Sequence, residues 1–214
     1  VILLSTNYAF AQDRQKFGIN AGLTYSNFRG MNIPTFQFEY GFGFIVGVSY
    51  EQYLNDKLSI KANLSYDKKA NKGTSEIEFR GSIDEEPVVV NQELSFQYDY
   101  VTLPILMKYD FTDESSFFVN GGPFIGYLLS SRIVDNTSTN NLYPDTQSRT
   151  TTDYNNRLDY GLTLGFGKAF RLNDENSIVV EIRNNIGFAK TNKDDTYQGD
   201  SVQTNSFNLL VGWA

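Results

Sequence analysis

The chain has 214 residues, a formal net charge of -7 and neither cysteine nor histidine. This length fits one domain. The acidic balance argues against a nucleic-acid partner, because phosphate binding depends on clustered Lys and Arg. The lack of cysteine excludes disulfides and thiolate metal sites. Apolar residues make up 40% of the chain and its mean hydropathy is -0.37. No uninterrupted apolar stretch reaches the roughly 18 residues of a transmembrane helix.

The N-terminus carries a targeting pattern. Val1 to Leu4 form a short apolar run, and Ala9 and Ala11 fit the small-x-small rule of a signal-peptidase site. We therefore expect residues 1–11 to be the remnant of a secretory signal peptide in a truncated precursor, and residues 12–214 to form the mature domain. The alternative is an ordinary apolar strand at the N-terminus.

A two-residue alternation of bulky apolar residues with small or polar ones organises the rest of the chain. In the last copy Phe207, Leu209, Val211 and Trp213 alternate with polar or small neighbours. The pattern occurs eight times, at about 16–28, 39–52, 58–67, 100–109, 116–132, 158–170, 178–189 and 206–213. Each copy predicts a β-strand. Pro104 cannot donate a ladder hydrogen bond, so it predicts a bulge or local irregularity in the fourth strand.

The connections alternate in length. Short links rich in Asn and Asp lie at 54–57, 112–116 and 171–176, and long links lie at 29–38, 70–92, 133–156 and 190–203. Antiparallel strands with all short turns at one end and all long loops at the other are typical of bacterial outer-membrane barrels. The sequence therefore predicts an all-β fold, an eight-stranded antiparallel up-and-down transmembrane β-barrel with both termini on the short-turn side.

The two faces of these strands predict which side meets lipid. One face carries bulky aliphatic and aromatic groups, while the other is dominated by Gly, Ser, Thr, Ala and Asn, which suits the narrow interior of eight strands. Aromatic residues near strand ends would form interfacial girdles; they include Tyr25, Phe28, Tyr40, Tyr50, Tyr109, Phe111, Phe170 and Trp213. The alternative is a soluble lipocalin-like binding barrel, which keeps its apolar residues inside.

Three segments resemble a known family. These are YDYVTLPILMKY at 98–109, VNGGPFIGY at 119–127 and LGFG at 164–167. They are similar to strands of the PorT-like outer-membrane β-barrel proteins, often called porin-family proteins. The resemblance implies a barrel in the outer membrane of a Gram-negative bacterium. Its named member is implicated in protein secretion, and no catalytic residue of the family carries over to this chain.

Charged residues of both signs share the small, polar face. They are Glu51, Lys61, Asp67, Lys108, Asp159, Glu181 and Arg183. Closure of the sheet would bring them into one narrow lumen, where unpaired charges cost several kcal/mol each. We therefore predict ion pairs across the lumen, which would make the barrel a plug rather than a wide pore.

Other chemical motifs are weak. The absence of histidine removes Ser-His hydrolysis and imidazole-ligated metal. The glycines between Gly41 and Gly47 lack the spacing of a dinucleotide-binding loop. Asp194, Asp195 and Asp200 lack the ligand order of a calcium loop. We expect no enzymatic activity, no cofactor and no metal.

Two long links are the other candidates for function. Residues 135–156 are mostly Asn, Asp, Ser, Thr and Gln, which predicts a mobile segment without a core. The link at 70–92 keeps β character through Ile77, Phe79, Ile83 and Val88 to Val90, which predicts a protruding hairpin. Its exposed edge could recruit another protein by strand addition, and the alternative is a solvated flap.

These features leave more than one function open. We expect a structural or protein-interaction role, including that of a secretion-machinery component, with outer-membrane lipid and envelope or secretion proteins as partners. A narrow channel or a small-ligand-binding porin is the alternative, and the soluble binding barrel is more distant.

Overall fold

The computed structural model describes residues 15–31, 35–79, 88–111, 116–136, 147–173, 176–193 and 201–214. The predicted signal remnant at residues 1–11 lies outside these ranges. The long strands are β1 (Gln15–Arg29), β2 (Gln37–Tyr53), β3 (Leu58–Phe79), β4 (Val88–Asp110), β5 (Phe117–Asp135), β7 (Leu158–Arg171), β8 (Ser177–Gly187) and β9 (Gln203–Trp213). A short strand, β6 (Gln147–Thr150), and a 3-10 turn, η1 (Thr152–Tyr154), lie between β5 and β7. Among the described residues, no helix has the length and apolar character needed to cross a bilayer.

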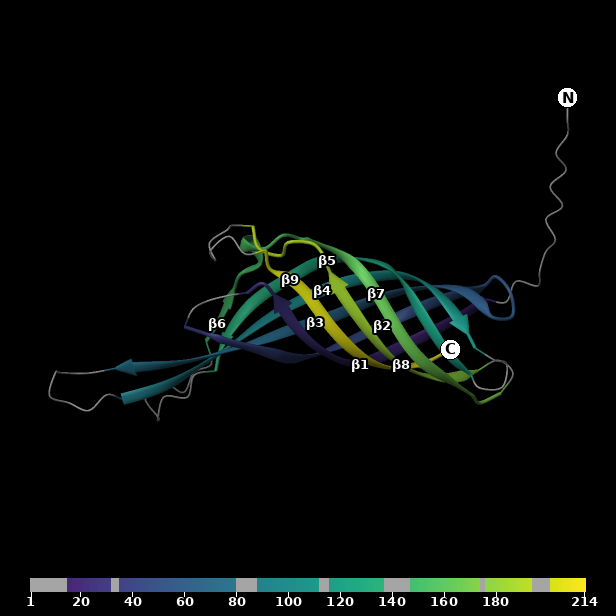
Figure 1. The fold of residues 1–214 in the computed structure, drawn as a ribbon, viewed down its shortest axis with the longest axis horizontal. Coiled ribbons are helices and arrows are strands. Elements are labelled where there is room, and N and C mark those ends of the chain that lie inside the picture. The colour runs from purple at the N-terminus through teal and green to yellow at the C-terminus, as the bar shows by residue number, and fades with distance from the viewer. Residues whose placement is uncertain are drawn as a thin grey trace, which may run out of the picture.

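The eight long strands close into a ring (Figure 1). Each pairs antiparallel with its neighbours in the chain, and β1 pairs with β9 through a register that runs from Ile19–Trp213 to Arg29–Gln203. The β4–β5 pairing joins the two halves of the sheet. The predicted eight-stranded up-and-down barrel is confirmed. Closure matters because a spanning sheet must leave no unpaired edge in lipid.

The connections gather at two ends of the barrel. We call the end with the links at 54–57, 111–116 and 172–176 the short-turn end, and the opposite end the long-loop end. Gln15 pairs with Gln52, and Ala214 donates its N–H to the Ser177 carbonyl at 3.0 Å. The first and last described residues therefore lie at the short-turn end, as predicted.

The side chains alternate between the outer wall and the lumen. The outer wall is apolar, with Ile19 and Leu164 both 60% exposed, while Thr24 and Asn208 on the other face are fully buried. The bulky groups therefore point outward and the small polar groups inward, as the pattern predicts. This orientation excludes the lipocalin-like alternative, which needs the opposite arrangement.

The prediction that Phe28 belongs to an interfacial girdle is wrong. Phe28 is only 2% exposed and its ring centroid lies 4.4 Å from that of Tyr98, inside the barrel. The period of two places Phe28 on the same face as Thr24 and Ser26, so its ring points into the lumen. Tyr25, by contrast, stacks on Tyr40 on the outer wall, with ring centroids 4.7 Å apart.

Strands β3 and β4 continue past their neighbours as a two-stranded hairpin. Their register extends to Phe79–Val88, whereas β2 leaves β3 at Thr74 and β5 leaves β4 at Leu94. The teal strands that reach furthest to the left in Figure 1 are this extension. The predicted hairpin is confirmed for the residues described; Ile83 lies outside them.

The loop between β5 and β7 is more ordered than its composition predicts. The prediction of a mobile segment is wrong for residues 147–156, because β6 pairs with Arg132–Asp135 and Asn155 is 7% exposed. Asn155 donates to the Thr151 carbonyl at 2.9 Å and to Ser131 Oγ at 3.0 Å. Short polar side chains here replace an apolar core with hydrogen bonds to the backbone. The remainder of this segment, residues 137–146, lies outside the described ranges.

Pro104 marks an irregularity, but not a bulge. Pairs between β3 and β4 run up to Ser65–Thr102 and resume at Ala62–Ile105 with the register unchanged. The register shift of β4 lies instead against β5, between Asp99 and Tyr100.

Candidate functional site

The lumen is the place where the predicted charged residues meet. Their exposures range from 0% for Asp67 to 8% for Lys61, and all seven are buried. They are Glu51, Lys61, Asp67, Lys108, Asp159, Glu181 and Arg183. Strands β2, β3, β4, β7 and β8 supply them from different sides of the ring. This placement follows from the period of two, which directs every second residue inward.

The first group of charges lies nearest the short-turn end. Lys108 Nζ lies 2.8 Å from Glu51 Oε1 and 3.2 Å from Asp110 Oδ2. The Ser59 hydroxyl donates to the same Glu51 oxygen at 2.6 Å. Glu51 is thus held by a cation and a hydroxyl, which offsets much of the cost of removing its charge from water.

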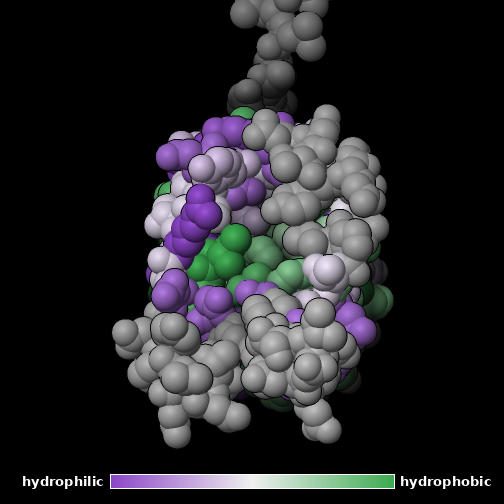
Figure 2. Space-filling view, turned by 90° about the vertical axis from the view of Figure 1, so that its left-hand side faces the viewer, coloured by the Kyte–Doolittle hydropathy of each residue, from purple (hydrophilic) through white to green (hydrophobic). Residues whose placement is uncertain are grey.

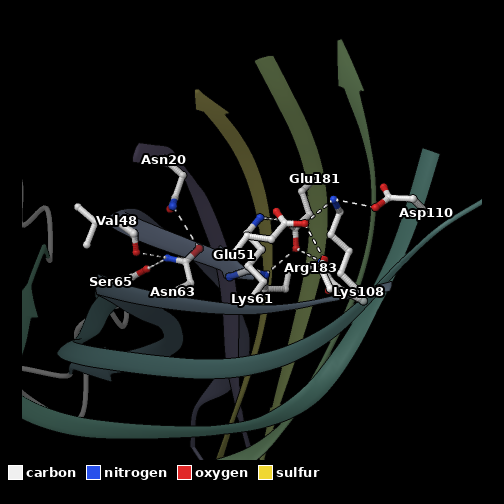
Figure 3. Close-up of polar contacts among 12 residues, drawn as sticks. Asn20, Val48, Glu51, Lys61, Asn63, Ser65, Lys108, Asp110, Glu181 and Arg183 are labelled. Atoms are coloured by element: carbon white, nitrogen blue, oxygen red, sulfur yellow. Dashed lines mark hydrogen bonds and ion pairs between the residues drawn. The ribbon is translucent and has the colours of Figure 1, made fainter. Parts of the chain in front are cut away.

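A second group is centred on Glu181 (Figure 3). Arg183 Nε lies 2.8 Å from Glu181 Oε1, and Lys61 Nζ reaches Oε2 of the same carboxylate at 3.4 Å. The Asn120 amide adds a hydrogen bond at 2.9 Å. One carboxylate therefore connects side chains of β3, β5 and β8. Figure 3 shows the first and second groups next to each other inside the barrel.

An aromatic ring packs beside both groups. Phe118 is fully buried, with Lys108 Nζ 4.8 Å and Lys61 Nζ 5.9 Å from its centroid. A ring face attracts a cation more strongly when both are removed from water. Phe118 thus fills lumen volume and also gives the two buried ammonium groups a favourable contact.

A third group lies nearer the long-loop end and contains a residue that the sequence interpretation missed. Lys69 is fully buried, 3.4 Å from Asp159 Oδ2, and its ammonium lies 4.9 Å from the Tyr100 ring centroid. Thr204 donates its hydroxyl to the same Asp159 oxygen at 2.7 Å. Lys69 has the same parity as Lys61 and would have been found by continuing the third strand beyond residue 67.

Asp67 differs from the other predicted residues. It accepts a hydrogen bond from the Thr24 hydroxyl at 2.9 Å, and no Lys or Arg of the described part of the chain lies within 4.0 Å of it. Its charge is nevertheless matched in the lumen as a whole. Four of the buried charged residues are cations, Lys61, Lys69, Lys108 and Arg183, and four are the anions Glu51, Asp67, Asp159 and Glu181; a further buried anion, Asp99, has its own partner in Arg132 at 3.2 Å.

Beyond these groups, an apolar cluster crosses the lumen at the long-loop end. It consists of Phe28, Phe96, Tyr98, Tyr100, Leu128 and Val202, each no more than 6% exposed, with Met31, Phe38, Leu94 and Ile133 packed against it. We call this set the mouth cluster. Figure 2, viewed onto this end, shows a hydrophobic floor within a partly hydrophilic rim. The alternation pattern does not reveal this cluster, because aromatic residues near strand ends are expected on the outer wall.

Small cavities lie in the polar half of the lumen. Two cavities of about 20 Å³ each adjoin Lys61; Asn63 and Glu181 line one, and Lys108 and Glu51 line the other. A volume of this size admits about one water molecule. Across the described ranges, no three acidic side chains gather as a metal site would require.

Comparison with known proteins decides the family. Residues 10–193 match the family described as "Outer membrane protein beta-barrel domain". The chain belongs to this family. This outer-membrane protein therefore spans the outer membrane of a Gram-negative bacterium with its strands. The narrower resemblance to PorT-like proteins stays a prediction. Barrels of this class place short turns in the periplasm and long loops outside the cell, which assigns the two ends.

Several solved structures are similar to this outer-membrane protein. Ail of Yersinia pestis, in complex with the heparin analogue sucrose octasulfate, shares 13% identity over 94% of this chain and 97% of its own, with a TM-score of 0.39. Neisserial surface protein A shares 12% identity, with 93% and 97% covered and a TM-score of 0.41. OprG from Pseudomonas aeruginosa shares 9% identity, with 92% and 93% covered and a TM-score of 0.41. No curated protein matches the sequence.

Proposed function

We propose that this outer-membrane protein is a non-enzymatic structural or interaction protein whose lumen is closed to solutes. The observation that carries the proposal is the filling of the lumen at successive levels. Paired charges occupy the periplasmic half, Lys69 and Asp159 lie above them, and the mouth cluster lies nearest the extracellular loops. Eight-stranded barrels have an interior that side chains can fill completely.

The mouth cluster is the main barrier in this proposal. An ion that passed it would leave water for a layer of aromatic and aliphatic groups, and the charged groups that border this layer, Lys69 and Asp159, are already paired with each other. Leu128 is fully buried and Tyr98 is 6% exposed, so this layer is packed rather than hydrated. The matched charges below it favour pairing with one another over exchange with solutes.

The extracellular end supports the interaction role. Here the loops after β5 and β8 are tied together, because Asn156 donates to the carbonyls of Lys190 and Asn192 at 2.9 and 3.2 Å. Lys193 Nζ donates to the Asp153 carbonyl at 2.7 Å. Ordered loops present a surface that binds with less loss of entropy than mobile ones. Participation in a protein-secretion machinery is one form of this role, and the PorT-like resemblance is its support.

Site-specific photo-crosslinking in intact cells tests the interaction role. A photoreactive residue at Tyr154, which is 59% exposed on the extracellular loops, should give discrete adducts with envelope proteins. Leu54, 48% exposed in a periplasmic turn, is the matched control for random collisions. An adduct pattern from position 154 identical to that from position 54, or none from either, would contradict an extracellular interaction.

A narrow channel is the second candidate, and the polar cavities beside Lys61 are the observation that favours it. They lie in the periplasmic half, and a path through the barrel would still have to pass the mouth cluster. Single-channel recording separates the two functions, since only a continuous path gives discrete openings.

A further inference from the structure

The extracellular hairpin ends in a stretch of strand that, among the residues the structure describes, is paired on one side alone. Residues Val88–Gln92 of β4 pair with Ser75–Phe79 of β3, while the pairing of β4 with β5 ends at Leu94–Asp135. The Asn136 amide donates to the Glu93 carbonyl at 2.8 Å, which closes that ladder. Within the described ranges no strand pairs with the other side of Val88–Gln92, which we call the β4 edge.

The β4 edge differs from the opposite edge of the hairpin. The sequence from Val88 to Gln92 is VVVNQ, uncharged and rich in β-branched residues, which favour strand pairing. The opposite edge, Ser75–Phe79, carries Glu76 and Glu78. Charged residues are a common protection of strand edges against unwanted pairing. The β4 edge is therefore the one suited to accept another strand.

The surroundings of the β4 edge are acidic. Glu76 lies opposite Asn91 and Glu78 opposite Val89, and all four side chains are exposed on one face of the hairpin. Val89 is 52% exposed. At the base of the hairpin, Lys72 is already paired with Glu93 at 3.0 Å. In the sequence, the stretch 75–93 holds six acidic residues and one basic residue.

We propose that the β4 edge binds an extended, basic segment of another protein by strand addition. This inference rests on the proposed interaction role and names the partner's chemistry. A strand added beside β4 lies about 10 Å from β3, two strand spacings away. That separation is comparable to the screening length at physiological salt, so Lys or Arg side chains on the added strand are attracted by Glu76 and Glu78. Main-chain hydrogen bonds supply affinity and the charges supply selectivity.

The same charges disfavour a second copy of this chain as the occupant. Edge-to-edge pairing of two hairpins would bring two acidic faces together, and like charges across an interface are a common device against the wrong partner. The acidic side chains of the hairpin attract a basic segment and repel a second copy of the hairpin.

Binding of synthetic peptides to the full-length protein in lipid nanodiscs tests the inference. Three ten-residue probes are used: alternating Val and Lys, the same peptide with N-methylated backbone on one edge, and alternating Val and Glu. We expect the first to bind and the other two to bind at least tenfold more weakly. Equal binding of the N-methylated peptide would overturn strand addition, equal binding of the acidic peptide would overturn the charge preference, and no binding by any probe would overturn both.

Variants of the protein locate the site. Glu76→Gln together with Glu78→Gln should weaken the basic peptide about 2- to 10-fold, as expected for two exposed charge pairs. Asp153→Asn, on the extracellular loops outside the hairpin, is the control and should leave binding unchanged. Equal loss in both variants would overturn the location.

Self-association is tested separately. Because the chain has no native cysteine, Asn91→Cys reports edge-to-edge contact directly. Disulfide-linked dimers of this variant in the membrane would assign the β4 edge to a second copy and overturn the proposal. If the peptides fail while position 154 still crosslinks to envelope proteins and the lumen stays silent, the inference fails and the proposed function stands.

Discussion

Replacing Glu181 by Gln should destabilise the barrel more than replacing Arg183 by Leu, although both changes break the same ion pair. Arg183 Nε lies 2.8 Å from Glu181, which also receives Lys61 at 3.4 Å and Asn120 at 2.9 Å. Arg183→Leu leaves the carboxylate with two of its three partners. Glu181→Gln removes the carboxylate that two buried cations, Lys61 and Arg183, share.

The expected magnitudes follow from this difference. Breaking a buried pair costs about 3 to 5 kcal/mol. We therefore expect the free energy of unfolding to fall by about 3 kcal/mol in Arg183→Leu and by about 5 kcal/mol in Glu181→Gln. The matched control is Lys72→Leu, which breaks a pair of similar length, 3.0 Å, on the exposed hairpin. Exposed pairs are worth at most about 1 kcal/mol.

Urea unfolding in lipid vesicles measures these differences. Trp213 is the only tryptophan and lies on the outer wall, so its fluorescence reports whether the barrel is folded and inserted. The reasoning would be refuted if Arg183→Leu cost no more than Lys72→Leu, or if Glu181→Gln proved the milder of the two lumen variants.

Two further predictions concern the wall of the barrel. Leu164→Arg, on the outer face of β7, should lower the free energy of unfolding by about 2 to 4 kcal/mol because it places a charge in lipid. Leu172→Arg, in a periplasmic turn, should lower it by about 1 kcal/mol or less. The two leucines are similarly exposed, 60% and 59%, so equal effects in the same urea assay would argue against the assigned membrane position. Gly43→Ala should slow folding and lower stability because a Cβ there would overlap the Lys68 carbonyl. Gly126→Ala should be tolerated because a Cβ there meets its nearest atoms at 3.5 Å. Heat-modifiable gel mobility measures the refolding rates of the two variants, and similar rates would contradict the close approach of β2 and β3.

The barrel could be predicted because lipid and lumen impose opposite demands on alternate residues. Ile19 and Leu164 point outward, and Thr24 and Asn208 point inward. The alternation in each segment therefore predicts both a transmembrane strand and the face of that strand that meets lipid. The alternating lengths of the connections then set the topology. Local exceptions were harder to predict: Pro104 interrupts the pairing of β4 with β3 without changing its register, whereas the register shift of β4 against β5 lies between Asp99 and Tyr100, where no proline marks it.

The lumen was predicted in part. Parity alone placed Glu51, Lys61, Asp67, Lys108, Asp159, Glu181 and Arg183 inside the barrel. It did not reveal that Lys69 pairs with Asp159, since the shear of the sheet decides which inward residues share a level. Phe28 and Phe96 were missed as lumen residues because aromatic composition near a strand end suits either face.

Order in the loop before β7 was also beyond the sequence pattern. Asn155 and Thr152 are buried through hydrogen bonds to neighbouring segments, not through apolar contact. Amino-acid composition alone does not show which polar side chains form such hydrogen bonds, so it predicted mobility here.

The central claim, a lumen closed by paired charges and the mouth cluster, is tested most directly by single-channel recording in planar bilayers. The wild-type protein should show no discrete openings at any voltage that the bilayer withstands. The double variant Phe96→Gly with Tyr98→Gly, which thins the mouth cluster, serves as the comparison and should increase ion leakage. Reproducible unitary openings of the wild-type barrel would contradict the account.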